Sequence, residues 1–218
     1  MGYNVAVDGP AGAGKSTIAK LVAKKKGFIY VDTGAMFRAL AIHFLKKGIH
    51  PEDRENIIEA CKGVEVSIAY ENDAQQVYLN GENVTTQLRT EEVGNMASRI
   101  SSVPEVRTKL LELQRELAKT KDVIMDGRDI GTVILPDADV KIYLTASVHT
   151  RAQRRFDELK EKGIDCDFDE IAKDIADRDY RDMNREIAPL KQAQDAVLVD
   201  SSDMTIQEVV DTICSYCR

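Results

Sequence analysis

A glycine-rich segment near the start of the chain has the residue types and spacing of a phosphate-binding loop. The segment, Gly9-Pro10-Ala11-Gly12-Ala13-Gly14-Lys15-Ser16 followed by Thr17, fits the pattern G-x-x-x-x-G-K-[ST]. Glycines let backbone N–H groups turn toward phosphate oxygens, and the positive end of the next helix strengthens that attraction. We expect Lys15 to reach the β- and γ-phosphates of a nucleoside triphosphate and the Ser16 hydroxyl to coordinate Mg2+.

A second candidate is the turn Asp126-Gly127-Arg128-Asp129, which follows the apolar segment Val123-Ile124-Met125. An acidic residue at the carboxyl end of a strand beside the phosphate-binding loop is suitably placed to hold the water molecules of Mg2+. We therefore predict that role for Asp126. A simple Asp-Gly turn is the alternative, but Arg128 and Asp129 beside it favour a functional site.

Charged residues in the second half of the chain, mostly arginines, recur at helical spacing. Arg178, Asp182 and Arg185 lie at i, i+4 and i+7, so a helix would place them on one face. Arg151 and Arg155, at i and i+4, could form a matching group on the donor side. A solvated, salt-bridged helix is the alternative. Because phosphoryl transfer spreads negative charge over several oxygens, a cationic arm of this kind would stabilise it.

The overall composition limits the kinds of partner. The 218-residue chain carries a formal net charge of −7, which argues against a dedicated nucleic-acid binder. It contains no apolar stretch of the roughly 20 residues that a membrane-spanning helix needs. The first residues lead directly into a strand-like segment and show no basic-then-apolar signal pattern. We expect a cytoplasmic protein that binds no membrane.

The spacing of apolar residues predicts alternating strands and helices. Expected strands lie at 3–8, 28–31, 64–69, 76–79, 82–84, 123–125, 140–144 and 196–199. Expected helices lie at 15–26, after 32–34 to about 46, at 51–61, on both sides of a break at 101–104, at 149–162, at 168–185 and at the C-terminus. The alternation indicates a doubly wound α/β sheet, whereas the Asn80-Gly81 turn predicts an antiparallel insertion within it.

Four segments together carry a family resemblance over nearly the whole chain, from Val5 to about Ile213. They are GPAGAGKST, DTGAMFRA, DGRDIGT and DRDYRDMNREIAPL. In this combination the chain resembles the bacterial-type cytidylate kinases, nucleoside monophosphate kinases of the P-loop class. The resemblance implies transfer of the γ-phosphoryl group of ATP to CMP or dCMP, with ADP and (d)CDP as products of pyrimidine nucleotide metabolism. It also implies a monomer whose partners are these small nucleotides and Mg2+.

The resemblance implies a P-loop NTPase three-layer fold with a central parallel sheet, an antiparallel β/α insertion on the monophosphate-binding side and a short helical lid. We expect a single kinase domain over residues 1–218. Its core would span about 1–50 and 89–218. The insertion would occupy about 51–88 with adjoining helices, and the lid about 155–185.

The resemblance also assigns roles to individual residues. Lys15, Arg128 and Arg178 would be catalytic, and Arg151 and Arg155 would join the phosphate-binding loop in binding ATP. Ser16 and Asp126 would hold the metal. Acceptor-binding residues would be Thr33, Arg38, Ser98, Arg107, Arg128, Asp129, Asp182 and Arg185. Among these, Arg107 and Arg128 would hold the acceptor phosphate or read the base, and Asp182 and Arg185 would hold the ribose hydroxyls.

The chain departs from the family pattern at one position. The common DTGxxYR motif has Phe37 where a tyrosine is usual. The aromatic surface is kept, but a hydrogen bond from a tyrosine hydroxyl is lost, which affects the detail of acceptor binding.

Two other functions stay open at this point. One is another small-molecule P-loop kinase, acting on UMP, AMP or a non-nucleotide such as shikimate, which a panel of acceptors would distinguish. The other is a regulator that binds ATP without phosphorylating a small molecule. A GTPase is disfavoured, because the base-reading N/TKxD sequence is absent.

Overall fold

The central sheet is parallel and is built from short apolar segments far apart in the chain. In the computed structural model, which describes residues 2–72 and 74–218, its order is β2-β6-β1-β7-β8. The strands are β1 (Asn4–Asp8), β2 (Ile29–Asp32), β6 (Val123–Gly127), β7 (Val140–Thr145) and β8 (Val197–Asp200). The parallel pairing aligns Asp8 with Gly127 and Asp32 with Asp126. The carboxyl ends of three strands therefore bring acidic residues to one edge of the sheet.

Helices cover both faces of this sheet, as predicted. Val5 and Val7 of β1 pack in one apolar cluster with α1 (Lys15–Lys26) and α8 (Ile206–Tyr216). Ala6, between them, belongs to the cluster on the opposite face. That second cluster contains α2 (Thr33–Lys46) and α5 (Pro104–Thr120). Because side chains alternate along a strand, the continuous apolar run from Val5 to Val7 of β1 contributes to both cores.

An antiparallel unit lies beside the main sheet. It contains α3 (Arg54–Lys62), β3 (Val66–Glu71), β4 (Ala74–Leu79) and β5 (Glu82–Asn83), with strand order β3-β4-β5. Asn80 and Gly81 both have positive φ, 49° and 81°, as a tight hairpin requires. A short 3-10 turn, η1 (Thr85–Gln87), leads to α4 (Glu91–Ile100). The antiparallel insertion predicted from the Asn-Gly turn is confirmed.

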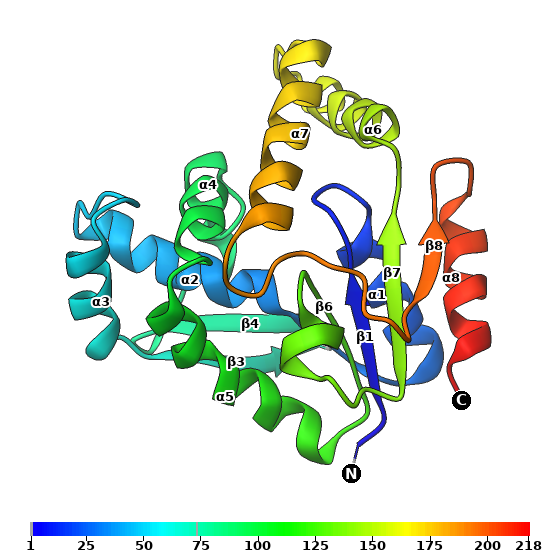
Figure 1. Cartoon of the computed structure of the whole chain (residues 1–218), viewed down its shortest axis with the longest axis horizontal. Helices are drawn as coiled ribbons and strands as arrows, with labels where there is room; N and C mark the ends of the chain where they lie inside the picture. Colours follow the sequence, from blue (N-terminus) through cyan, green and yellow to red (C-terminus); the bar gives the residue numbers. More distant parts are fainter. Residues whose placement is uncertain (1, 73) are drawn as a thin grey trace.

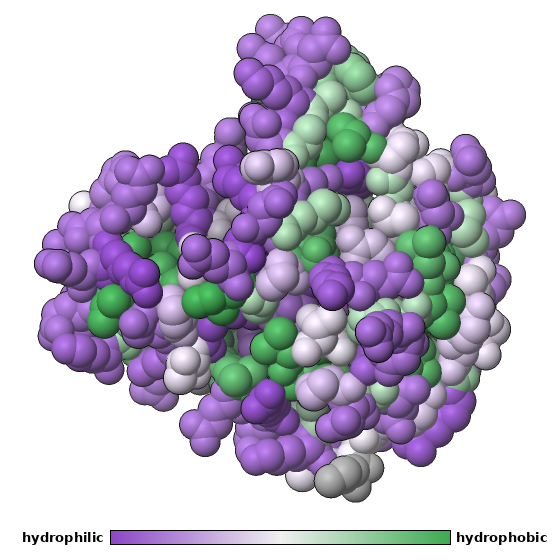
Figure 2. Space-filling view, in the orientation of Figure 1, coloured by the Kyte–Doolittle hydropathy of each residue, from purple (hydrophilic) through white to green (hydrophobic). Residues whose placement is uncertain are grey.

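Two helices form an arm that projects from the carboxyl end of the sheet (Figure 1). They are α6 (Val148–Glu161) and α7 (Phe168–Asn184), with side-chain N-caps at Ser147 and Asp167. The aromatic rings of Phe168 and His149 pack at 5.2 Å between centroids and help to hold the helices together. Figure 2 shows mainly hydrophilic side chains over the arm tip and over the lobe that contains α3 and α4.

One element was not expected from the sequence. Residues Ile130–Ile134 form a π-helical turn, η2, directly after the Asp-Gly-Arg-Asp segment. Five apolar or small residues carry no amphipathic pattern, and this turn is stabilised by a partner more than a hundred residues away. The Asp8 carboxylate accepts hydrogen bonds from Ile130 N and Gly131 N, each at 2.8 Å.

Leucines in two helices provide a matched test of this packing. Leu40 in α2 has no exposed surface, whereas Leu21 in α1 is 40% exposed. Leu40→Ala is expected to lower the free energy of unfolding by about 2–5 kcal/mol, because it removes buried methyl groups and leaves a cavity. Leu21→Ala should cost less than about 1 kcal/mol. Urea denaturation of both variants measures the difference, and equal losses would contradict the assigned core.

Candidate active site

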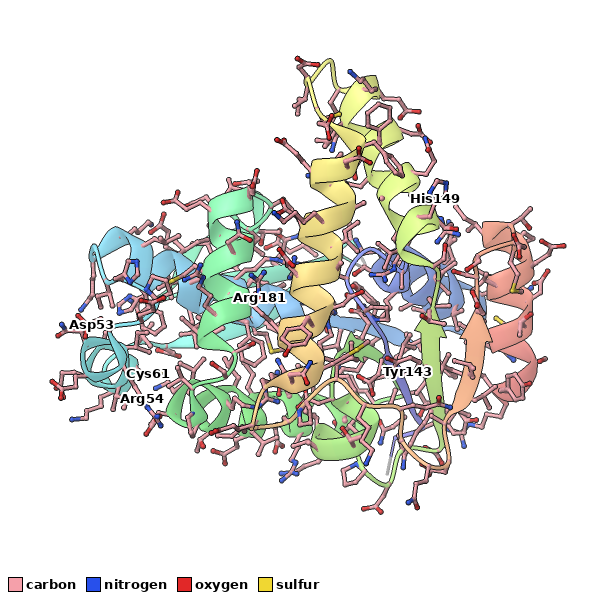
Figure 3. All side chains as sticks on the ribbon, turned by 45° about the horizontal axis from the view of Figure 1, so that its top comes forward. Asp53, Arg54, Cys61, Tyr143, His149 and Arg181 are labelled. Atoms are coloured by element: carbon pink, nitrogen blue, oxygen red, sulfur yellow. The ribbon has the colours of Figure 1, made fainter. Side chains whose placement is uncertain are left out.

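A cavity of about 730 Å3 opens at the carboxyl ends of β1, β2 and β6, beneath the arm. Figure 3 labels His149 near the start of α6 and Arg181 on the C-terminal half of α7, and both of these helices contribute residues to the cavity wall. The cavity is lined by the phosphate-binding loop, by the Asp126–Asp129 turn and by side chains of α4, α5, α6 and α7. It is therefore assembled from segments that are distant in the sequence.

The phosphate-binding loop has the backbone that its glycines predict. Gly14 has φ 85° and is the N-cap of α1, so the helix begins at Lys15. At Gly9 any Cβ would lie 1.9 Å from the Leu144 carbonyl oxygen. Lys15 is 6% exposed, and its Nζ donates to the carbonyl oxygens of Gly9 and Pro10 at 2.8 and 2.7 Å. Burial lowers the pKa of Lys15, and the positive charge of Arg128 lowers it further.

Oxygen ligands suited to a hard cation lie next to this lysine. Ser16 Oγ donates to Asp126 Oδ2 at 2.9 Å, and Tyr30 Oη donates to Asp126 Oδ1 at 3.0 Å. Burial, followed by the nearby Asp32 carboxylate, raises the pKa of Asp126 to about 6. A buried carboxylate that costs free energy when charged gains from a cation beside it. Ser16 and Asp126 therefore offer oxygen ligands of the kind that a hard divalent cation such as Mg2+ binds.

Most arginines in the cavity are held by carboxylates. Asp129 forms an ion pair with Arg107 and lies 3.5 Å from Arg185. Arg128 Nε donates to Asp182 Oδ2 at 2.9 Å. Burial raises the pKa of Asp182, but Arg128 and the other guanidinium groups outweigh it, so the pKa lies below its ordinary value. These pairs hold guanidinium groups from α5, α7 and the turn after β6 around one space.

A further pair involves a residue that the sequence analysis did not select. Asp32 is the N-cap of α2, accepting from Ala35 N, and its other oxygen accepts from Arg89 at 3.1 Å. Arg38 lies 3.8 Å from the same carboxylate. Arg89 follows the antiparallel unit and lines the cavity. Its only sequence signal was its position at the end of the insertion, which did not distinguish it from a surface arginine.

Arg178 differs from the other arginines of the cavity. Its side chain is largely buried, yet its Nε has no hydrogen-bond partner in the part of the chain that the structure describes. Burial lowers the pKa of Arg178 to about 10, and the neighbouring Arg128 contributes to this shift. A buried guanidinium N–H without a partner, close to another cation, is costly, so this position favours an anionic ligand.

The donor-side arginines differ from each other. Arg151 is 4% exposed, and it donates to Ala11 O at 2.9 Å and to Asp179 Oδ2 at 2.6 Å. Its guanidinium thus connects the phosphate-binding loop to α7. Arg155 is exposed and pairs with Glu158 at 2.9 Å, at the edge of the cavity. Arg154, not selected from the sequence, also lines the cavity and donates to Ser201 O at 2.7 Å.

The structure brings nearly all of the sequence-predicted site residues to one cavity. Gly9 and Pro10 do not line it, although their carbonyls hold Lys15. The other predicted residues line it: Ala11, Gly12, Ala13, Gly14, Lys15, Ser16, Thr17, Thr33, Arg38, Ser98, Arg107, Asp126, Arg128, Asp129, Arg151, Arg155, Arg178, Asp182 and Arg185. The sequence did not single out four further residues that line the cavity: Asp32, Arg89, Ser101 and Arg154. It also did not single out Asp8, which supports the turn after β6.

Phe37 has a clear contact in this arrangement. It lines the cavity, and the Arg107 guanidinium lies 5.7 Å from the centroid of its ring. This cation–π contact needs an aromatic ring and no hydroxyl. Phenylalanine can therefore support Arg107 as a tyrosine would.

Comparison with known proteins identifies the family. The model of the cytidylate kinase family matches residues 5–218. The chain belongs to the cytidylate kinase family. It is 50% identical to the cytidylate kinase of Caldicellulosiruptor bescii over 210 residues, which cover 96% of this chain and 93% of that protein. It is also 50% identical to the cytidylate kinase of Shouchella clausii over 212 residues, covering 97% and 94%.

Among solved structures, the fold is shared with an uncharacterized protein from Eubacterium ventriosum. The TM-score is 0.52 at 13% identity, and the match covers 99% of this chain and 98% of the other. A likeness at this identity concerns the fold alone. Within the described residues, no helix has both the length and the apolar composition needed to cross a membrane. The family resemblance and the fold class predicted from the sequence are confirmed.

The raised pKa of Asp126 has a consequence for stability. An acid whose pKa is about 6 in the folded state and 3.8 ordinarily makes folding less favourable as pH rises through this interval. Asp126→Asn removes the ionisation, and its amide can accept from one of the hydroxyls of Ser16 and Tyr30 and donate to the other. The midpoint temperature of the variant minus that of the wild type should therefore become more positive from pH 4 to pH 7. Thermal unfolding without nucleotide measures it.

The exposed Asp137 provides the control. Asp137→Asn removes a solvated carboxylate and should shift the midpoint temperature by a similar amount at both pH values. A difference for Asp126→Asn that does not change with pH would contradict the effect of burial on this carboxylate.

Proposed function

We propose that this member of the cytidylate kinase family transfers the γ-phosphoryl group of ATP to CMP or dCMP, forming ADP and CDP or dCDP. The observation that carries the proposal is a single cavity with a phosphate-binding loop at one end and carboxylate-held arginines at the other. The similarity to cytidylate kinases over 96% of the chain supports the acceptor. The comparisons do not favour a different small-molecule kinase or a non-catalytic regulator.

At the donor end, the backbone N–H groups of residues 11–16 would hold the phosphates of ATP. Lys15 Nζ would exchange its two carbonyl partners for β- and γ-phosphate oxygens, which are stronger acceptors for a buried cation. Mg2+ would neutralise phosphate charge when held near Ser16 and Asp126. Arg151 would keep the loop in place through Ala11, and Arg155 would contact ATP at the edge of the cavity.

At the acceptor end, we assign the monophosphate to Arg38, Arg107 and Arg128. Thr33, Ser98 and Asp129 would lie near the base or support the groups that contact it, since all three line the cavity. Asp182 and Arg185 would bind the ribose hydroxyls.

The reaction needs alignment and positive charge more than proton transfer. The acceptor oxygen is already an ionised phosphate, so direct in-line attack on the γ-phosphorus requires no general base. Arg178, whose buried Nε has no partner among the described residues, would bind the transferring group as its charge spreads. We further propose one kinase domain whose insertion at about 51–88 and lid at about 155–185 close over the substrates and exclude water. The cytoplasmic location and the monomeric state stay predictions.

An acceptor panel tests the function. ADP formation from ATP and Mg2+ is measured with CMP, dCMP, UMP, AMP and GMP offered separately. We expect strong stimulation by CMP and dCMP and little by the purine nucleotides. Equal stimulation by AMP, or none by any monophosphate, would refute the assigned acceptor.

Arg178 and Arg181 provide a matched test of the transfer step. Both are on α7, but Arg178 lines the cavity, whereas Arg181 is exposed outside it. Arg178→Met is expected to lower kcat about 100- to 1000-fold, the range for loss of one transition-state charge contact. Arg181→Met should leave kcat nearly unchanged. Steady-state kinetics with saturating ATP and CMP decides, and similar effects of the two changes would argue against the assigned role.

A further inference from the structure

Ser101 lies at the break between α4 and α5, where the sequence suggested only the end of a helix. It is 8% exposed and lines the cavity. Its Oγ donates to Ser98 O at 2.7 Å and accepts from Arg185 Nη1 at 3.0 Å. A serine hydroxyl has one donor and two acceptor sites, so both bonds can form together. The hydroxyl therefore joins the acceptor-side helix α4 to a residue 84 positions away at the end of α7.

The other contacts of Arg185 show why this bond matters. Arg185 Nε donates to Ala188 O at 2.6 Å, and Nη2 lies 3.5 Å from Asp129 Oδ1. In the described chain Nη2 is buried and makes no hydrogen bond of good geometry. Ala188 and Ser101 thus hold two nitrogens of the guanidinium plane, while the third remains available. Two fixed points are enough to set the orientation of a planar group.

Ser101 also supports a second arginine through its backbone. Arg107 Nη1 donates to Ser101 O at 3.1 Å. The residue thereby contacts Ser98, Arg107 and Arg185, which come from the end of α4, the start of α5 and the end of α7. All three are among the proposed acceptor-binding residues.

We propose that Ser101 is a positioning residue for the acceptor nucleotide, whose hydroxyl holds the Arg185 guanidinium in its binding orientation. The proposal rests on the proposed function, since it takes Arg185 as an acceptor contact. Ser101 acts on affinity for CMP and not on ATP, because its contacts belong to the acceptor side. This selective effect on CMP affinity distinguishes Ser101 from a residue that only stabilises the fold.

The neighbouring serine provides a matched control. Ser102 Oγ donates to Arg99 O at 2.8 Å, the same local bond to the carbonyl three residues earlier that Ser101 makes. Ser102 is exposed and does not line the cavity. Ser101→Ala and Ser102→Ala therefore lose equivalent bonds at the end of α4, and only Ser101→Ala loses the bond to Arg185.

Steady-state kinetics of the two variants tests the proposal. Ser101→Ala is expected to raise KM for CMP about three- to tenfold, the range for the net contribution of one ordinary hydrogen bond, because the lost bond acts on CMP only through Arg185. Its KM for ATP and its kcat should stay close to those of the wild type, and Ser102→Ala should resemble the wild type throughout. An unfolded fraction lowers kcat and leaves KM unchanged, so a folding defect cannot imitate this result.

A double-mutant cycle checks that the effect passes through Arg185. Because Arg185→Met removes the guanidinium, adding Ser101→Ala to it should cause no further rise in KM for CMP. Independent, additive effects would overturn the proposal, as would equal KM values for Ser101→Ala and Ser102→Ala. If the wild type itself does not phosphorylate CMP, the proposed function fails, and the two failures are thus distinguished in one assay.

Discussion

Repulsion between closely spaced arginines is the constraint on which the site depends. In a phosphate-binding site without its ligand, the guanidinium groups are partly desolvated and lie near one another. Both conditions are unfavourable for cations. The chain meets this constraint with buried carboxylates. Asp129 pairs with Arg107 and Arg185, Asp182 with Arg128, and Asp32 with Arg38. Removing one carboxylate would leave buried charges uncompensated, an effect of about 3–5 kcal/mol in other proteins.

The same pairs prepare the site for its ligands. A carboxylate holds a guanidinium in place until a phosphate competes for the same N–H donors, so little reorganisation of the arginine is required on binding. Lys15 is held in the same manner by carbonyl oxygens of its own loop. Arg178 differs from them, since its buried Nε has no hydrogen-bond partner among the described residues. Burial and the neighbouring Arg128 lower the pKa of Arg178 to about 10, so a bound anion would stabilise its charged form.

The parallel sheet explains why these charges can meet at all. Asp8, Asp32 and Asp126 end three adjacent strands, and parallel pairing brings strand ends to one edge. Asp8 then accepts hydrogen bonds from Ile130 and Gly131 and so supports the turn that carries Arg128 and Asp129. Burial raises the pKa of Asp8 to about 6, opposed by these two bonds. Burial of these acidic groups thus lowers the stability of the fold but fixes the position of the site residues, as is common at functional sites.

The sequence by itself determined the local features of this protein. The phosphate-binding loop, α1, the Asn80-Gly81 hairpin and the helical spacing of Arg178, Asp182 and Arg185 follow from contiguous residues, because glycine conformation and helical periodicity act over a few positions. Most of the residues that line the cavity were predicted from sequence motifs and from the family resemblance that these motifs carry. Only the tertiary structure decided their partners: the carboxylate for each arginine, the support of the π-helical turn by Asp8, and the contact of Ser101 with Arg185. Several of these bonds join distant residues, such as Asp8 with Gly131 at 123 positions and Arg128 with Asp182 at 54, and no local pattern records such pairs.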